Sequence, residues 1–244
     1  MTKLLRKNVH QTLLLTLNRP KKINALDAEI WMLLRDALIE ADLNNNIKSV
    51  VITGAGGNFS SGVDLESMVG DQGNKYEEPF ETCIDALMNF NKPLIAAAEG
   101  MAVGGGATIL LHFDFIFLDH KFKMKYPFTE LGLVPELGST YLLYNKVGFH
   151  KAFELLTSSE WILADEYYSL GLATNVSNNP LDKALKLSKK INALSQESLI
   201  ETKRILKSFD KDKVLLSRKL EADGMKALFG SEANLQAVTK FFTK

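Results

Sequence analysis

Strand-like runs alternate with helical patterns from His10 to about Val176, and this alternation limits the possible fold more than any other feature of the sequence. Residues 27–43 carry apolar side chains at helical spacing behind Asp27, which predicts an amphipathic helix with Asp27 as its cap. We therefore predict an α/β core over residues 1–178. Four apolar runs, each closed by Gly, Asn or a charged residue, are predicted to be strands: TLLLTLN (12–18), KSVVITG (48–54), KPLIAAAEG (92–100) and FDFIFLD (113–119).

The remaining residues, 179–244, have only helical patterns and are rich in lysine. We expect a C-terminal helical region that either folds back over the core or packs on a neighbouring subunit. Its apolar rows need cover, because the region is too rich in lysine to form a core by itself. These rows include Leu185, Leu187, Ile191 and Leu194.

The charge balance and the scarcity of metal-binding residues exclude several classes of function. Lys and Arg total 29, as do Asp and Glu, so no basic field attracts nucleic acid. No apolar run approaches the ~18 residues that cross a bilayer, and the first residues lack a secretory signal, so we expect a cytoplasmic protein without membrane partners. Cys83 is the only cysteine and the four histidines are scattered, so we expect neither a disulfide nor a metal site.

Two glycine-containing stretches follow predicted strands: NFSSGVDL (58–65) and GMAVGGGAT (100–108). The triple glycine fits neither a dinucleotide-binding motif nor a phosphate-binding P-loop. The turns Gly62-Val63 and Gly104-Gly105 could each direct one backbone N–H at the same point, which would form an oxyanion hole for a thioester carbonyl that becomes an enolate. The alternative is that these glycines only let a helix approach the sheet closely.

Glu136 stands in an otherwise apolar stretch, LGLVPELGST (131–140). Leu133, Val134 and Leu137 would desolvate its carboxylate and raise its pKa toward the range of a general base. Proton abstraction next to a carbonyl needs such a base beside the oxyanion hole. Alternatively, Pro-Glu followed by Gly is an ordinary exposed turn, with the glutamate in water.

Together with LNRPKKINAL (17–26), these stretches resemble the crotonase (enoyl-CoA hydratase/isomerase) superfamily over essentially the whole chain. The resemblance implies a spiral of repeated ββα units and a C-terminal α-helical trimerisation region, hence a homotrimer or a dimer of trimers. It also implies an acyl-CoA substrate without a further cofactor. The N–H groups of Val63 and Gly105 would polarise the thioester. The implied substrate-binding residues are Lys22, Ala25, Ser61, Gly62, Asp64, Leu65 and Gly104, with Asp64 also expected to cap the following helix.

The departures from the family pattern bear on the reaction. Thr108 and Phe128 occupy the positions at which hydratases of this family place their two glutamates, and water addition needs two carboxyl groups. Glu136 matches the glutamate of LGLxxExG in the Δ3,Δ2-enoyl-CoA isomerase branch, so we predict double-bond isomerisation, with Glu130 as the second candidate acid. The alternatives are enoyl-CoA hydration, another enolate reaction such as hydrolysis, dehalogenation or decarboxylation, or an acyl-CoA-binding protein without turnover.

Overall fold

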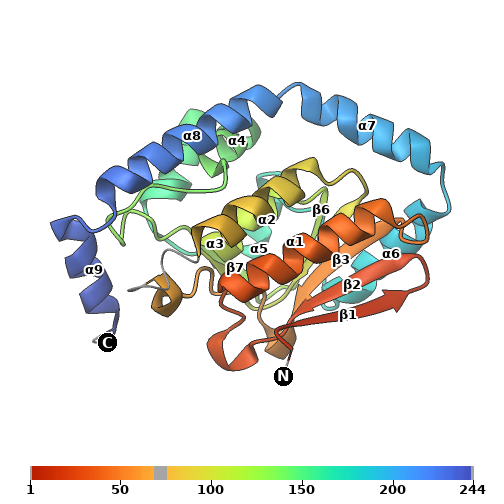
Figure 1. The fold of residues 1–244 in the computed structure, drawn as a ribbon, viewed down its shortest axis with the longest axis horizontal. Coiled ribbons are helices and arrows are strands. Elements are labelled where there is room, and N and C mark those ends of the chain that lie inside the picture. Colours follow the sequence, from red (N-terminus) through yellow and green to blue (C-terminus); the bar gives the residue numbers. More distant parts are fainter. Residues whose placement is uncertain (1, 69–75, 243–244) are drawn as a thin grey trace.

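A six-stranded sheet forms the centre of the protein in the computed structural model, which describes residues 2–68 and 76–242 (Figure 1). The strand order is β1-β2-β3-β4-β6-β9, with β1 antiparallel to β2 and all other pairs parallel. The predicted α/β core is thereby confirmed, and the four predicted strands correspond to β2, β3, β4 and β6. The strands are β1 (Leu4–Val9), β2 (Thr12–Leu17), β3 (Ser49–Gly54), β4 (Leu94–Ala98), β6 (Phe115–Leu118) and β9 (Asn175–Val176).

A second, three-stranded sheet begins where the chain leaves β4. Its strands are β5 (Met101–Val103), β7 (Lys123–Lys125) and β8 (Ile162–Leu163). The strand β5 pairs in parallel with β7 and leads directly into the triple glycine, so the second sheet fixes where that turn starts.

The helices α1 (Ala28–Leu43) and α2 (Glu77–Asn89) pack against each other over one face of the large sheet (Figure 1). The predicted cap of α1 is confirmed, because the Asp27 carboxylate accepts the N–H of Ile30 at 3.0 Å. Trp31 and Leu34 of α1 are fully buried and belong to the main hydrophobic core. This layer fixes the position of the turn between β2 and α1.

The opposite face of the sheet is covered by α6 (Pro180–Asn192), the first helix of the C-terminal region. Ile191 is buried against the sheet, and Leu185 and Leu187 pack against the same small core. These three apolar side chains are therefore covered within the chain, whereas Leu194 is 54% exposed. The C-terminal region folds back over the core at this point, and the domain boundary after residue 178 stays a prediction.

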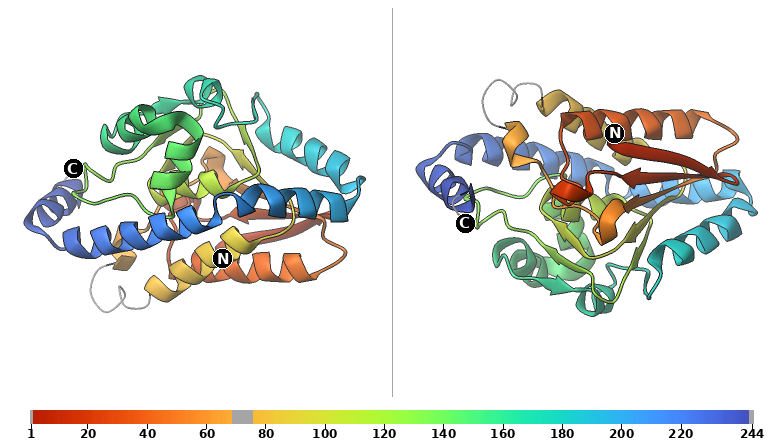
Figure 2. Two further views of the ribbon diagram at one scale, coloured as in Figure 1. Left: turned by 90° about the horizontal axis from the view of Figure 1, so that it is seen from above. Right: turned by 90° about the horizontal axis from the view of Figure 1, so that it is seen from below.

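The helices α7 (Gln196–Ser208) and α8 (Lys211–Leu228) run as an arch over the core, and α9 (Glu232–Phe242) lies beyond the far end of α8 (Figures 1 and 2). In the part of the chain that the structure describes, no helix is both long and apolar enough to span a bilayer. The remaining helices are α3 (Gly105–Thr108), α4 (Ser139–Thr157), which has a kink at Gly148, α5 (Ala164–Ser169), and the 3-10 helices η1 (Pro20–Lys22), η2 (Ala55–Gly57), η3 (Leu65–Met68) and η5 (Ile109–His112).

Candidate active site

Three of the four stretches selected from the sequence meet at one end of the sheets. An isolated parallel bridge joins Leu26 to Val63, and another joins Ser60 to Ala102. Ser60 connects all three stretches: its hydroxyl donates to the carbonyl of Asn24 at 2.9 Å and accepts the N–H of Gly62, in its own stretch, at 3.1 Å. Its main chain also accepts the N–H of Val103 at 3.0 Å. The β2–α1 turn, the Gly62 turn and the triple glycine therefore form one hydrogen-bonded unit.

The buried side chain of Asn24 and the guanidinium of Arg19 reinforce this unit. The Asn24 amide donates to the carbonyls of Ala55 and Asn58, at 2.9 and 2.8 Å. Arg19 donates to the Asp64 carboxylate at 2.8 Å and to the carbonyl of Ala25 at 2.7 Å. Both side chains belong to the stretch LNRPKKINAL (17–26), and the sequence alone indicates no role for either. Their structural role is to hold neighbouring turns in register.

The two glycine turns face each other at van der Waals distance. Gly62 has φ +86° and Gly104 has φ +51°, conformations that side-chain-bearing residues rarely adopt. A β-carbon added to Gly62 would lie 3.1 Å from the nitrogen of Gly105, and one added to Gly105 would lie 3.7 Å from the nitrogen of Val63. The absence of side chains thus lets the two peptide groups approach the same region.

The N–H groups of Val63 and Gly105 remain available for a ligand. Within residues 2–68 and 76–242 neither one donates to a protein acceptor, whereas the neighbouring N–H groups are bonded. The N–H of Asp64 donates to the carbonyl of Leu26 at 2.9 Å, and that of Gly104 donates to the carbonyl of Lys125 at 3.0 Å. Two free donors on adjacent turns are what an oxyanion hole requires.

Glu136 lies beside these donors. Its Oε1 atom would be 3.0 Å from a β-carbon on Gly105, so the carboxylate is at van der Waals distance from the triple-glycine turn. The pKa of Glu136 is raised from 4.5 to about 8, mainly by desolvation and then by the nearby carboxylates of Glu221 and Glu81. Glu136 also raises the pKa of the buried phenol of Tyr76, after the larger effect of burial. A carboxyl group with this pKa suits proton transfer near neutral pH.

The turn that carries Glu136 is held in an unusual conformation. Leu137 has φ +64° and Gly138 has φ +73°, so two successive residues are left-handed before α4 begins. The ring of His112 donates through Nε2 to the carbonyl of Leu137 at 2.8 Å. Burial lowers the pKa of His112 to about 4, so the imidazole is neutral at physiological pH. The N–H of Gly138 donates to the carboxylate of Glu221 on α8, at 2.6 Å.

The predicted substrate-binding residues lie around the same turns. Asp64 accepts the N–H of Glu66 at 3.3 Å, at the first turn of η3. Burial opposes ionisation of Asp64, but Arg19 and Lys22 outweigh it and hold the pKa of this carboxyl below its usual value. The remaining members of the set, namely Ala25, Ser61, Gly62, Leu65 and Gly104, belong to the hydrogen-bonded turns or directly follow them.

Glu130, the second candidate acid, is more exposed than Glu136. Glu130 has 51% of its side chain exposed and pairs with Lys125 at 2.5 Å. The two positions at which hydratases place their glutamates hold Thr108 and Phe128, and neither is an acid. The Thr108 hydroxyl donates to the carbonyl of Gly104 at 3.2 Å, and Phe128 is buried in the main core. Across the two described ranges, no three His, Cys, Asp or Glu side chains come together as a metal site would require.

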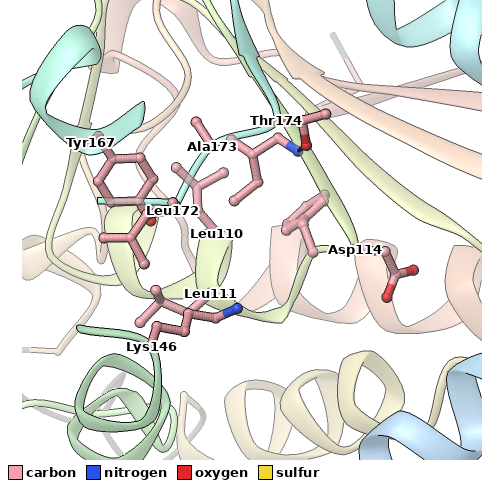
Figure 3. A pocket seen from close by; sticks show the side chains of 11 residues that line it. Leu110, Leu111, Asp114, Lys146, Tyr167, Leu172, Ala173 and Thr174 are labelled. Atoms are coloured by element: carbon pink, nitrogen blue, oxygen red, sulfur yellow. Dashed lines mark hydrogen bonds between the residues drawn. The ribbon is translucent and has the colours of Figure 1, made fainter. Parts of the chain in front are cut away.

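A separate cavity of about 100 Å³ lies beside η5 and α5 (Figure 3). Leu110, Leu111, Tyr167 and Leu172 form much of its wall, and Lys146 and Asp114 also line it. None of the predicted site residues lines this cavity. This cavity is therefore separate from the glycine turns.

Glu221 is the principal residue near Glu136 that sequence reasoning missed. It lies 85 positions after Glu136, on a helix with many charged residues, and no local spacing distinguishes it from its neighbours. Its burial became visible only in the structure, in which Glu221 is 6% exposed.

Comparison with known proteins agrees with the geometry. Residues 8–244 match the model of the family "Enoyl-CoA hydratase/isomerase". The peroxisomal enoyl-CoA delta isomerase 3 of Mus musculus is 33% identical over 66% of this chain, which spans 53% of that protein, about half its length. A probable enoyl-CoA hydratase of Rhizobium meliloti is 29% identical, with 95% of this chain and 91% of the relative covered. The structure of Pseudomonas aeruginosa OdaA superposes with a TM-score of 0.95, at 29% identity and full coverage of both chains. The predicted crotonase fold is thereby confirmed.

Proposed function

Because the chain belongs to the enoyl-CoA hydratase/isomerase family, whose model matches residues 8–244, we propose that it isomerises 3-enoyl-CoA to 2-enoyl-CoA with Glu136 as its single base. The carboxylate of Glu136 removes a proton from C2, and the electron pair moves into the thioester carbonyl to give a dienolate. The N–H groups of Val63 and Gly105 stabilise the negative oxygen. The protonated Glu136 then delivers the proton to C4, which leaves the double bond between C2 and C3.

One observation carries this proposal: the Glu136 carboxylate lies against Gly105, whose N–H is one of the two free donors. A base beside the oxyanion hole can reach the carbon next to the polarised carbonyl. The reaction needs no further cofactor, because the same proton leaves C2 and returns at C4.

Hydration is the second candidate, because a probable hydratase is among the relatives. The contacts of the nearby acids argue against it. Glu221 is already occupied by the N–H groups of Gly138 and Thr140, and Glu81 pairs with Arg218 at 2.5 Å. Neither carboxyl group is free to hold the attacking water, so Glu136 would have to provide both proton transfers alone.

The quaternary arrangement and the location of the protein also belong to this proposal. A homotrimer or dimer of trimers would cover the apolar side chains that the C-terminal helices expose. The cytoplasmic location expected from the sequence stays a prediction. The exposed apolar side chains of α7, α8 and the link between them include Ile205, Leu206, Phe209, Leu215, Leu216 and Leu220.

The test is to assay the purified protein with 3-enoyl-CoA and, separately, with 2-enoyl-CoA and water. We expect isomerisation with little or no hydration. Glu136→Gln keeps the shape and removes the base, so kcat should fall by roughly 10²–10⁴-fold with a smaller effect on binding. Glu130→Gln is the matched control and should have a mild effect. Strong hydration by the wild type with unchanged activity in Glu136→Gln would refute the isomerase proposal, and binding of acyl-CoA without turnover would favour a non-catalytic role.

A further inference from the structure

The start of α4 receives its cap from another helix. Oε2 of Glu221 on α8 accepts the N–H of Gly138 at 2.6 Å, and Oε1 accepts the N–H of Thr140 at 2.8 Å. The hydroxyl of Thr140 donates to Oε1 at 2.7 Å, and that of Ser217 donates to it at 3.2 Å. Burial raises the pKa of the Glu221 carboxyl above its usual value, and the donors that surround both oxygens offset part of this effect by stabilising the ionised form.

The residue that directly precedes α4 cannot provide this cap. Gly138 has no side chain, and the first N–H groups of a helix need an acceptor. A carboxylate at a helix N-terminus also interacts favourably with the helix dipole. Glu221 therefore compensates for a glycine that the left-handed turn at Gly138 requires, and it does so two residues from Glu136.

Glu221 affects Glu136 through its charge as well as through its hydrogen bonds to the turn. Apart from desolvation, Glu221 is the largest contributor to the raised pKa of Glu136, and Glu81 on α2 follows it. Arg218 on α8 pairs with Glu81 and so offsets part of its charge. The other titratable groups at this turn are the phenol of Tyr76 and the neutral ring of His112.

We propose that Glu221 is the positioning residue for the general base: its carboxylate fixes the Glu136-Leu137-Gly138 turn through the start of α4 and places a second negative charge near Glu136. This inference rests on the proposed role of Glu136. The C-terminal helices would then take part in the reaction as well as in the proposed subunit association.

A contact from α9 supports the same view of the C-terminal helices. The side-chain amide of Asn234 donates to the carbonyl of Leu131 at 2.8 Å, and Asn234 is 3% exposed. Its main-chain nitrogen would lie 3.0 Å from a β-carbon on Gly132. The stretch 131–138 is thus held at its start by α9 and at its end by α8.

The experiment compares Glu221→Gln, Glu221→Asp and Asp223→Asn. Glu221→Gln removes the charge and one acceptor oxygen, so kcat for 3-enoyl-CoA should fall roughly 10- to 100-fold, the range expected from a misplaced base. The acidic limb of the kcat–pH profile should move to lower pH, because a nearby negative charge is lost. Glu221→Asp keeps the charge but shortens the side chain, so kcat should fall while the limb stays in place. Asp223→Asn makes the same charge change at an exposed position of α8 and should alter neither quantity.

A second readout does not depend on turnover. The carboxyl carbon of Glu136 is titrated by NMR in ¹³C-glutamate-labelled protein and assigned by comparison with Glu136→Gln. A shift to lower pH in Glu221→Gln supports the inference even if 3-enoyl-CoA is not a substrate, in which case only the proposed function fails. If the wild type isomerises 3-enoyl-CoA but the titration and the limb do not move in Glu221→Gln, Glu221 is only a structural cap. If Glu221→Gln does not fold, Glu221→Asp tests the inference instead. A lower kcat in that variant supports the positioning role, and a wild-type kcat overturns it.

Discussion

Oε1 of Glu136 lies 3.0 Å from the point at which a β-carbon on Gly105 would stand. Gly105 is not in the left-handed region, so its backbone would accept other residues. The neighbouring Gly104 differs, because its φ is +51° and its missing β-carbon faces open space, with the nearest atom 4.0 Å away. A glycine is therefore needed at position 105 because a side chain there would crowd the carboxylate of Glu136. A glycine is needed at position 104 because the backbone there has a positive φ angle.

These two glycines give contrasting predictions. Gly105→Ala should displace the Glu136 carboxylate by a few tenths of an ångström and lower kcat roughly 10- to 100-fold, with little change in melting temperature. Gly104→Ala should instead destabilise the protein by about 1–3 kcal/mol, the usual cost of a strained backbone conformation. Steady-state kinetics and thermal unfolding of both variants measure the contrast. Full activity in Gly105→Ala would show that the carboxylate need not lie where the structure places it.

The second prediction concerns the pH dependence of the reaction. Glu136 must be ionised to accept a proton, and its pKa is raised to about 8, first by desolvation and then by Glu221 and Glu81. The value of kcat/KM should therefore increase with pH and level off above about pH 8. Initial rates with 3-enoyl-CoA between pH 5 and 10 test this, with unfolding checked at each pH. If kcat/KM instead changes near pH 4.5, the ordinary pKa of glutamate, the catalytic base is exposed to water and is not the desolvated Glu136 carboxylate.

The raised pKa of Glu136 also predicts a change in stability. The folded state holds the proton up to about pH 8, whereas the unfolded chain releases it near pH 4.5, so this group makes the protein less stable as pH rises between the two values. Glu136→Gln cannot ionise, and above pH 8 it should be more stable than the wild type. The gain should be on the order of 1–3 kcal/mol, because one pKa unit corresponds to about 1.4 kcal/mol and the partly exposed carboxylate is screened by water. Urea unfolding of both proteins at pH 5 and pH 9 measures it, with equal stabilities at pH 9 as the contrary result.

The parts of the fold that local patterns specify were predictable from the sequence. The buried strands β2, β3, β4 and β6 are apolar runs, and α1 has a marked apolar stripe with an aspartate cap. The edge strand β1 was not predicted, because four of its six residues are exposed and its sequence, LLRKNV, lacks a clear alternation. The strands of the second sheet were missed because two or three residues carry too little pattern.

The candidate site also contains residues that local patterns indicate and residues that they do not. Glu136, Val63 and Gly105 could be selected as candidates because each belongs to a stretch whose order and spacing are informative by themselves. The role proposed for Glu221 rests on contacts between segments distant in sequence, and such contacts leave no local signature. The sequence indicated that the apolar side chains of α6 must be buried against another element. It did not indicate that this element is the large sheet of the same chain.

The fourth prediction concerns the ion pair between Arg19 and Asp64, at 2.8 Å, with side chains 15% and 10% exposed. Asp64→Asn removes this charge pair from a largely buried position, while Arg19 keeps Asp27 at 3.3 Å, so the variant should destabilise the protein by about 1–3 kcal/mol at pH 7. The pKa of Asp64 is lowered in the folded state, because Arg19 and Lys22 outweigh its burial, and the contribution is therefore lost as pH falls through that lowered value. The difference between wild type and variant should shrink in acid. Glu66→Gln, at the neighbouring exposed pair with Lys22, is the control and should change stability by less than about 1 kcal/mol.

The last prediction concerns association through the C-terminal helices. Leu206 is 64% exposed and Phe209 is 72% exposed where α7 ends, and they belong to the apolar surface that the proposed trimer would cover. Burying one such side chain gains about 1.5–3 kcal/mol, so charges at both positions should weaken the assembly strongly. Sedimentation at micromolar concentration should show the wild type as a trimer or hexamer and the double variant Leu206→Asp/Phe209→Asp as smaller species. Leu43→Asp introduces the same charge at a leucine that is 79% exposed on α1, outside the C-terminal region, and should leave the assembly intact. A monomeric wild type would remove the trimer proposal and require a complete site within one chain, which the contacts of Glu221 and Asn234 with the 131–140 stretch of the same chain would already permit.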